Sequence, residues 1–281
     1  MEEARPSRTA LRVAMRRAAH QIYDTPPLVF TDPLAVSLLG SEYLPEVERT
    51  RFKLTKPHSI ALRAFLVARS RHAEQQLERA VAQGVTQYVL LGAGLDTFAY
   101  RNPYPQLHVY EIDHPATQEW KRGLLAQSSI AIPQSLTYVP VDFEHQLLAT
   151  QLAEAGFDAA KPAFFAWLGV VPYLTPEAFR STLALIAASA KGSGVVMDYG
   201  QPRNALPLIE RLARDSMSAR VASVGEPFQL FFTPEDMAWE LRAFHTIEDI
   251  GTEELNALYF TGRSDNLRTM GASGRIVSAW L

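Results

Sequence analysis

The sequence predicts a doubly wound α/β sheet of seven strands, because short β-branched or apolar runs alternate with helical segments from Thr86 onward. This alternation is typical of βαβ units and a mostly parallel sheet. The predicted strands are residues 88–91, 107–112, 136–139, 163–167, 194–197, 228–232 and 275–280. The predicted helices that follow the first strand are residues 115–127, 176–190, 202–221 and 234–244.

The composition favours an enzyme that acts on a small molecule. The chain has 281 residues, 47% of them hydrophobic, and can bury one large core or two modest ones. Its 27 Lys and Arg residues nearly balance 30 Asp and Glu residues, so it offers no broad basic field for a nucleic acid or an anionic membrane. Cysteine is absent, which excludes disulfides and thiolate metal sites, and we expect no metal.

The N-terminal part of the chain reads as helical. Residues 8–82 have the composition and apolar spacing of helices, with Asp32 and Pro33 as one helix start. The first twenty residues carry Glu2 and Glu3 but no apolar segment of a secretory signal, and no apolar run is long enough to span a bilayer. These features predict a cytoplasmic protein that forms one compact unit.

Residues 89–97, VLLGAGLDT, run from a hydrophobic strand directly into a Gly-Ala-Gly turn. Glycine allows the backbone to approach a ligand closely, and a helix beginning after the turn would offer free amides to a nucleotide-like ligand. Gly-x-Gly after a strand also occurs as simple turn chemistry. Thr97 stands where the dinucleotide fingerprint has its third glycine, which disfavours NAD.

Residues 109–115, VYEIDHP, place carboxylates at the end of the next strand, about twenty positions after the glycines. A carboxylate there can accept hydrogen bonds from ribose hydroxyls. Asp113 is the stronger candidate, although it could instead cap a helix that starts at Pro115. Glu111 lies on the same strand face and either shares the role or flanks it.

A further acid follows the third strand in residues 139–144, VPVDFE. Asp142 could accept from the amine of an adenine and Phe143 could cover the base, but Asp142 could equally cap a helix. Ligands of open α/β sheets bind outside the carboxyl ends of the strands, where all three motifs fall. Together they predict a nucleotide site more strongly than any one of them does.

Four segments together resemble the leucine carboxyl methyltransferase family, and within it the bacterial O-methyltransferases of small molecules. These segments are GAGLDTFAYR (92–101), EIDHPATQEWKR (111–122), VPVDFE (139–144) and YLTPEA (173–178). The further matches are TDPLA (31–35), ARSR (68–71), GEPF (225–228) and YFTGRSDNLR (259–268). The resemblance therefore covers nearly the whole chain.

The resemblance implies an S-adenosylmethionine-dependent O-methyltransferase with the Rossmann-like class I methyltransferase fold. It implies a helical N-terminal cover over residues 1–84 and a methyltransferase domain over residues 85–281. Within that domain, a lid segment inserted at about residues 201–262 would close the acceptor pocket. The cofactor would be S-adenosylmethionine, with S-adenosylhomocysteine as its product.

The resemblance also implies a set of cofactor-binding residues. They are Arg69, Gly92, Ala93, Gly94, Asp96, Glu111, Asp113, Asp142 and Phe143. Arg69 matches an arginine that holds the methionine carboxylate, and a guanidinium can indeed form a bidentate pair with a carboxylate. A solvated helix face is the alternative for Arg69, and Arg17 is a weaker second candidate.

Leu168 departs from the family pattern. In residues 166–174, AWLGVVPYL, the family commonly has a glutamate at this position, which ends the fourth predicted strand. A leucine can neither accept a proton nor pair with the methionine amine. The local cofactor contact is therefore in doubt, and no general base is expected at that strand end.

Transfer of an activated methyl group depends mainly on alignment and exclusion of water. An ionised carboxylate acceptor needs no base, whereas a phenol or alcohol does. The catalytic residue stays unknown. The side chains to inspect as a base are His245, His114 and Tyr173, and the possible anchors for an acidic acceptor are Arg263 and Arg203.

Aromatic residues late in the chain are candidates for an acceptor pocket, although such residues more often belong to a core. They are residues 228–232, Trp239, Tyr259 and Phe260. We interpret His72, Trp120 and Lys121 as structural or surface residues. The sequence favours a carboxylate acceptor over a phenol or hydroxyl. A nicotinamide-dependent oxidoreductase and a non-catalytic S-adenosylmethionine-binding protein are the alternative functions.

Overall fold

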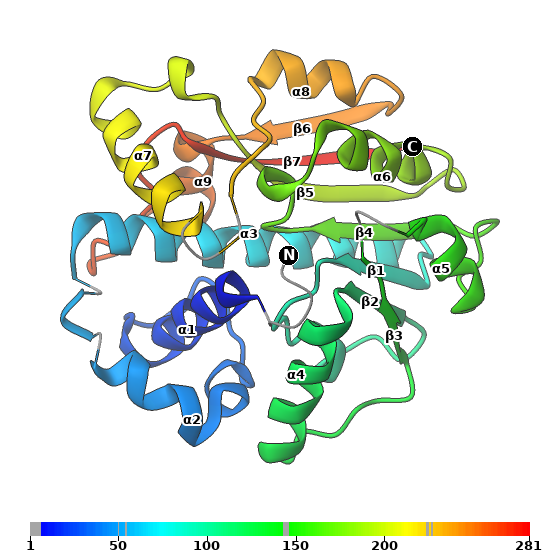
Figure 1. The fold of residues 1–281 in the computed structure, drawn as a ribbon, viewed down its shortest axis with the longest axis horizontal. Helices are drawn as coiled ribbons and strands as arrows, with labels where there is room; N and C mark the ends of the chain where they lie inside the picture. Colours follow the sequence, from blue (N-terminus) through cyan, green and yellow to red (C-terminus); the bar gives the residue numbers. More distant parts are fainter. Residues whose placement is uncertain (1–6, 50, 54, 143–145, 223–224, 226) are drawn as a thin grey trace.

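The structure is a computed structural model that describes residues 7–49, 51–53, 55–142, 146–222, 225 and 227–281. Within these residues a seven-stranded sheet crosses the molecule in the order β3-β2-β1-β4-β5-β7-β6 (Figure 1). The strands are β1 (Gln87–Leu91), β2 (His108–Asp113), β3 (Leu136–Pro140), β4 (Ala163–Trp167), β5 (Gly194–Gly200), β6 (Thr246–Ile250) and β7 (Gly274–Trp280). Neighbouring strands are parallel except at β7, which is antiparallel to β5 and β6. The predicted fold class is confirmed.

Helices pack on both faces of the sheet. They are α3 (Pro57–Ala82), α4 (Pro115–Gln127), α5 (Leu148–Glu154), α6 (Pro176–Ala187), α7 (Leu208–Ala222), α8 (Pro234–Glu240) and α9 (Thr252–Tyr259). Tyr88 and Leu90 of β1 belong to a buried cluster with residues of α3 and α9, whereas Val89 and Leu91 belong to one with α5, α6 and α8. Successive side chains of a strand point to opposite faces, so β1 is buried on both sides, as expected of a parallel sheet.

Two further helices precede the sheet, α1 (Arg8–Tyr23) and α2 (Ala35–Arg49). Ser7 caps α1 by accepting a hydrogen bond from the Ala10 N–H at 3.1 Å. Helix α2 is broken at Gly40, where φ is +53° and ψ is −163°. Alanines of α1 and leucines of α2 form a third hydrophobic cluster with α4, which places the two helices beside the carboxyl end of β1 (Figure 1).

Residues 228–232 do not form a strand, contrary to the prediction. Leu230 and Phe232 are buried in the core, which explains the apolar pattern. Their backbone, however, joins no ladder, since the N–H groups of Gln229 and Leu230 both donate to the carbonyl of Pro172. The seventh strand of the sheet is instead β6, which the sequence did not predict. It is an edge strand whose first three residues are exposed, so its sequence lacks the pattern of a buried strand.

The helix predicted from Pro202 starts later. Residues Arg203–Ala205 form a 3₁₀ turn, and α7 begins only at Leu208. Leu206 is extended (φ −96°, ψ 149°), because a residue that precedes a proline, here Pro207, is disfavoured in the helical region.

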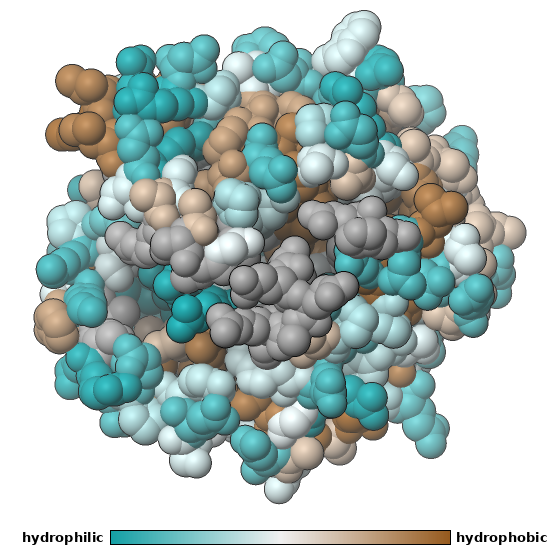
Figure 2. Space-filling view, viewed as in Figure 1, coloured by the Kyte–Doolittle hydropathy of each residue, from teal (hydrophilic) through white to brown (hydrophobic). Residues whose placement is uncertain are grey.

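Figure 2 shows hydrophobic side chains gathered at the upper left, over the start of α7. The exposed apolar residues of this helix are Leu208, Ile209 and Leu212, with 73%, 80% and 61% of their surface exposed. Among the described helices, none combines the length and the apolar character needed to cross a membrane.

Arg263 fastens the segment after α9 to the N-terminal cover. Its Nη1 donates to the carbonyl of Pro27 and its Nη2 to that of Thr25, both at 2.6 Å, and its Nε donates to Asp265 at 2.9 Å. Burial alone would raise the pKa of Asp265, but Arg263 and the N–H groups of Thr25 and Leu267 lower that pKa to about 2. These contacts hold the segment after α9 against the segment between α1 and α2.

Replacing Arg263 should therefore destabilise the fold in a pH-dependent way. We expect Arg263→Gln to lower the free energy of unfolding by about 2 kcal/mol at pH 7, since hydrogen bonds to a charged group are lost. Because the pKa of Asp265 is depressed in the folded state, its contribution is present above the unfolded value near 3.9 and disappears as the pH falls toward about 2. Urea unfolding between pH 2.5 and 7 measures this difference.

The matched control is Arg203→Gln, whose ion pair with Asp215 is solvent-exposed and should contribute little to the free energy of unfolding. A stability loss in Arg263→Gln that is the same at every pH would contradict the role of the ion pair.

Candidate functional site

A cavity of about 450 Å³ lies at the carboxyl ends of β1, β2 and β4. This is the edge of the sheet at which the three sequence motifs are expected to meet. Of the residues singled out from the sequence, those that line the cavity are Arg17, Arg69, Gly92, Ala93, Gly94, Asp96, Asp113, His114, Asp142, Leu168 and Tyr173. Phe143 lies outside the described residues, and Glu111 does not line the cavity.

The glycine turn brings two loops into close contact. Gly92 has φ of +68°, in the left-handed region, and a Cβ atom there would lie only 2.3 Å from Cγ2 of Val170 in the loop after β4. A side chain at position 92 would push these loops apart and fill the floor of the cavity. Glycine at this position is therefore required both by backbone conformation and by space.

No α-helix begins directly after the glycine turn, contrary to the expectation from the sequence. The chain forms a short 3₁₀ turn at Phe98–Tyr100 and then an irregular segment before β2. Pro103 and Pro105 explain this, since a proline lacks the N–H that a helix interior needs. The amides available to a ligand are therefore those of the turn itself.

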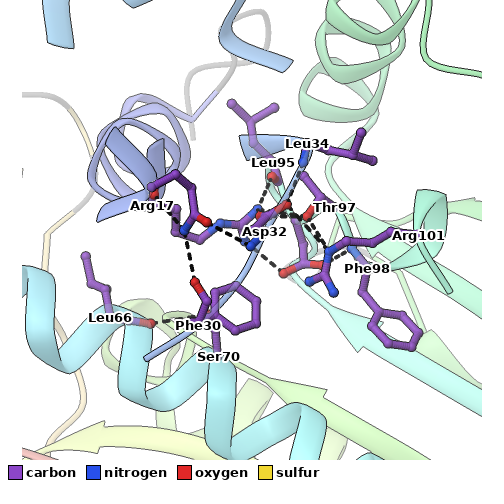
Figure 3. Close-up of polar contacts among 12 residues, drawn as sticks. Arg17, Phe30, Asp32, Leu34, Leu66, Ser70, Leu95, Thr97, Phe98 and Arg101 are labelled. Carbon is purple, nitrogen blue, oxygen red and sulfur yellow. Dashed lines mark hydrogen bonds and ion pairs between the residues drawn. The ribbon is translucent and has the colours of Figure 1, made fainter. Parts of the chain in front are cut away.

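A buried polar network joins the glycine turn to α1 and to the segment before α2 (Figure 3). The guanidinium of Arg17 lies 3.0 Å from both Asp96 and Asp32, and its Nη2 also donates to the carbonyl of Leu95 at 3.1 Å. The hydroxyl of Thr97 donates to Asp32 at 2.8 Å. Both Nη atoms of Arg17 are thus occupied by protein acceptors, so its placement fits a structural role better than a ligand contact.

Asp96 is an ionised member of this network. Burial alone would raise its pKa, but the positive charges of Arg17, Arg101 and Lys121 outweigh that effect and hold the pKa below its usual range. One carboxylate oxygen accepts from the N–H of Phe98 at 2.7 Å. Asp96 therefore lines the cavity while it orders the chain that follows the glycine turn.

The two acids of β2 have different surroundings. Asp113 accepts the N–H of Gly94 at 2.6 Å and that of His114 at 2.7 Å, at the cavity wall, and burial raises its pKa against these bonds. The residue that caps α4 is His114 rather than Asp113, since the Nδ1 of His114 accepts the N–H of Ala116 at the start of this helix. Glu111 is fully buried, with both oxygens 2.8 Å from the Nζ of Lys121.

Arg69 of α3 reaches the opposite wall of the cavity. Its Nη1 donates to Asp198, at the end of β5, at 2.8 Å, and the other oxygen of Asp198 accepts the N–H of Gly169 at 2.5 Å. In the described part of the chain, the remaining N–H groups of Arg69 have no hydrogen-bond acceptor. The carboxylate thus orients the guanidinium and leaves donors available to a ligand.

A second cavity of about 670 Å³ adjoins the first. The residues that line both are Thr9, Val13, Arg69, Gly169 and Tyr173. Tyr173 packs against Phe228, with ring centroids 5.1 Å apart. We refer to these five residues as the shared wall.

Three candidates for catalysis or anion binding lie away from both cavities. His245 precedes β6 and donates its N–H to Trp280, at the edge of the sheet opposite the glycine turn, so it cannot serve as a base in the cavity. Arg263 is held by Asp265 and two carbonyls, and Arg203 pairs with Asp215 on the surface.

The aromatic candidates divide between cavity and core. Phe228 lines the second cavity, whereas Phe260 is buried in the cluster under α3 and Trp239 is 68% exposed. Tyr259 hydrogen-bonds to His72 at 2.9 Å, so both are structural.

From the expected lid, Pro227 and Gln229 line the first cavity and Met217 lines the second. Closure of the acceptor pocket by this segment stays a prediction.

Sequence reasoning missed two sets of lining residues. Asp198 could have been suspected, since it is an acid at the end of a buried strand in the same register as the other motifs. Apart from Arg17, the residues of α1 could not have been suspected, because nothing in their sequence indicates which face of the helix meets the glycine turn. A Cβ atom at Gly94 would lie 3.1 Å from that of Ala10, so this contact is close.

The strand order and the antiparallel β7 define the class I fold of S-adenosylmethionine-dependent methyltransferases. Similar solved structures include a protein described as a methyltransferase from Thermobifida fusca YX, with a TM-score of 0.59, 18% identity and coverage of 92% of this chain and 98% of that one. A DUF574 family protein from Streptomyces avermitilis has a TM-score of 0.56 and 18% identity, covering 87% and 94% of the two chains.

The sequence comparisons identify the family. Residues 10–187 match the model of the leucine carboxyl methyltransferase family. YktD of Bacillus subtilis, named as an S-adenosyl-L-methionine-dependent methyltransferase, is 31% identical over 95% of each chain. SCO7813 of Streptomyces coelicolor, named likewise, is 32% identical over 77% of this chain and 75% of its own.

The chain therefore belongs to the leucine carboxyl methyltransferase family, and it is an S-adenosylmethionine-dependent methyltransferase. This confirms the resemblance read from the sequence motifs. Among the described residues, no group of three or more His, Asp or Glu side chains is placed to hold a metal ion.

The contact under the glycine turn can be tested by a double-mutant cycle. Gly92→Ala should cost about 1–2 kcal/mol for the left-handed backbone and about 1–3 kcal/mol more for the clash with Val170. In a Val170→Ala background only the backbone cost should remain. Unfolding free energies of the four proteins give the coupling between the two positions.

Gly84→Ala is the matched control, since Gly84 has φ of +93° but no atom within 4 Å of an added Cβ. It should show the backbone cost alone. Strictly additive effects of the Gly92 and Val170 substitutions would disprove the close approach of the two loops.

Proposed function

We propose that this methyltransferase transfers the methyl group to an oxygen, and that the oxygen belongs to a carboxylate of a small organic acceptor. The observation that carries the proposal is the composition of the shared wall. Among its described residues Tyr173 is the one side chain named from the sequence as a candidate base, and there is no histidine and no carboxylate to act as a general base. An acceptor that is already ionised at neutral pH needs none.

The other titratable groups of the first cavity support this proposal. Asp96 is paired with Arg17, and the Nδ1 of His114 is engaged as the cap of α4. Leu168 stands at the end of β4, where it contributes an apolar surface and no proton acceptor. These residues suit a site that positions an anion and excludes water better than one that removes a proton.

The residues of the first cavity fit the cofactor. Gly92 leaves the floor open, Asp113 and Asp142 offer acceptors on one side for the ribose and adenine, and Arg69 offers donors for the methionine carboxylate. S-adenosylmethionine, when bound, supplies a methyl group already activated on a sulfonium. The metal-free reaction, the absence of nucleic-acid and membrane partners and the cytoplasmic location stay predictions.

The role of Asp113 can be separated from a structural one. Asp113→Asn keeps one acceptor oxygen, so it can still accept one of the two N–H groups of Gly94 and His114, and its melting temperature should fall modestly. Loss of the charged acceptor should weaken binding of S-adenosylhomocysteine by about 1.5–3 kcal/mol, roughly 10- to 150-fold in Kd, as measured by calorimetry. NAD should bind to neither protein.

The pH dependence gives a second readout. Burial raises the pKa of Asp113, so its carboxylate takes up a proton at a higher pH than an ordinary Asp, whose pKa is near 3.9. As the pH is lowered, the cofactor affinity of the wild type should therefore begin to fall while the pH is still above that value. The Asn variant should lack this dependence, whereas Asp215→Asn, on the exposed face of α7, should behave as the wild type. Unchanged affinity in Asp113→Asn would contradict the ribose role.

The acceptor chemistry can be read from the stability of the product. Methyl-labelled S-adenosylmethionine and a panel of aromatic and aliphatic acids, with the matching phenols, should yield a methyl ester that releases methanol in mild alkali. The rate should be nearly flat from about pH 6.5 to 9, because the acceptor pKa lies near 4.

An alkali-stable label, the mark of a methyl ether, together with a rate that rises with pH, would overturn the carboxylate assignment. If S-adenosylhomocysteine binds but no acceptor is methylated, the alternative of a non-catalytic S-adenosylmethionine-binding protein is favoured.

A further inference from the structure

We propose that the second cavity holds the acceptor and selects an apolar molecule with an anionic group remote from the methylated oxygen, Arg12 being the main contact of that group. The inference rests on the proposed function in taking the shared wall as the place of transfer. From there the cavity extends between α1 and α3 toward α7, so the acceptor body would point away from the glycine turn.

The cavity is strongly cationic. Arg8, Arg12 and Arg16 follow one another at intervals of four residues, which places them on one face of α1, and all three line the cavity. Lys53 adds a further positive charge to the lining. Like charges at this spacing destabilise a helix, so an anion bound near Arg12 would offset part of this repulsion.

The described lining contains two carboxylates, Asp198 and Glu46, against five cationic side chains. Asp198 is occupied by Arg69, and Glu46 forms an ion pair with Arg49. Arg12 is half-buried, and within the described residues its guanidinium has no carboxylate partner. A partly buried, unpaired guanidinium is the group that gains most from a bidentate contact with an anion.

The start of α1 adds to the positive field. A helix N-terminus carries a partial positive charge, which acidic residues in the first turn usually offset. The first turn of α1 has no acidic residue and begins with Arg8. The dipole and the side chains therefore favour a negative ligand in the same place.

Much of the remaining lining is apolar, although Thr9, His58 and Ser59 also line the cavity. Leu62 and Phe65 of α3, Met217 of α7 and Phe228 line it together with Tyr173. A small hydrophilic anion would leave this surface uncovered, and a neutral apolar molecule would bury Arg12 without a partner. An aromatic or aliphatic acid satisfies both parts of the lining.

Two probes that differ only by a sulfonate group can test the assignment. The dyes 8-anilinonaphthalene-1-sulfonate and N-phenyl-1-naphthylamine share their rings, but only the first carries an anion. With S-adenosylhomocysteine at saturation, we expect each dye to bind once per chain by fluorescence titration, the sulfonate more tightly. Arg12→Gln should raise the Kd of 8-anilinonaphthalene-1-sulfonate at least about tenfold and leave the Kd of N-phenyl-1-naphthylamine within about twofold of the wild-type value.

Leu62→Trp should fill the apolar part of the cavity and weaken both dyes. Arg71→Gln is the matched control for Arg12, since Arg71 is exposed on α3 and lines neither cavity. Affinity for S-adenosylhomocysteine and melting temperature should be unchanged in Arg12→Gln, which shows that the first cavity and the fold are intact.

Equal sulfonate affinity in Arg12→Gln and wild type, or equal losses for both dyes, would overturn selection of an anion by Arg12. Undiminished binding of both dyes to Leu62→Trp would overturn the second cavity as their site. The dye titrations involve no turnover, so they decide this inference independently of whether the transferred methyl group proves to be an ester or an ether.

Discussion

The buried ion pairs of Arg17 hold the parts of this enzyme in place. Arg17 lies on α1, Asp32 precedes α2, and Asp96 follows the glycine turn, so one guanidinium joins the N-terminal helices to the wall of the first cavity. Burying these charges costs free energy that only the complete set of partners offsets, and removal of one member would leave an unpaired charge in the core. The cover is therefore an integral part of the site.

This constraint also explains how the two cavities come to meet. Because α1 is pinned against the glycine turn, its Thr9 and Val13 form one side of the shared wall, and its arginines face the space between α1 and α3. On the other side, Asp198 orients Arg69 and receives the N–H of Gly169. The proposed cofactor and acceptor regions are thus bounded by the same few residues.

Much of the architecture follows from local signals that act over short distances. Alternating apolar runs predicted the parallel strands, and the glycines and the acid Asp113 were placed at one sheet edge because parallel strands share their carboxyl ends. These signals failed for residues 228–232, whose apolar side chains are buried although their backbone is not paired in the sheet. They failed also for β6, an edge strand with exposed side chains. The prolines after Tyr100 replaced an expected helix by a turn.

The sequence by itself determined the fold class, the family and the glycine and acid motifs, because each is carried by local patterns in short segments along the chain. Only the tertiary structure decided which side chains from distant parts of the sequence form ion pairs and which of them line the same cavity. It assigned Glu111 to Lys121 rather than to the cavity, Arg263 to Asp265 and His245 to the far edge of the sheet. Such pairings depend on how helices dock on a sheet, and docking is governed by packing across the whole core rather than by local pattern.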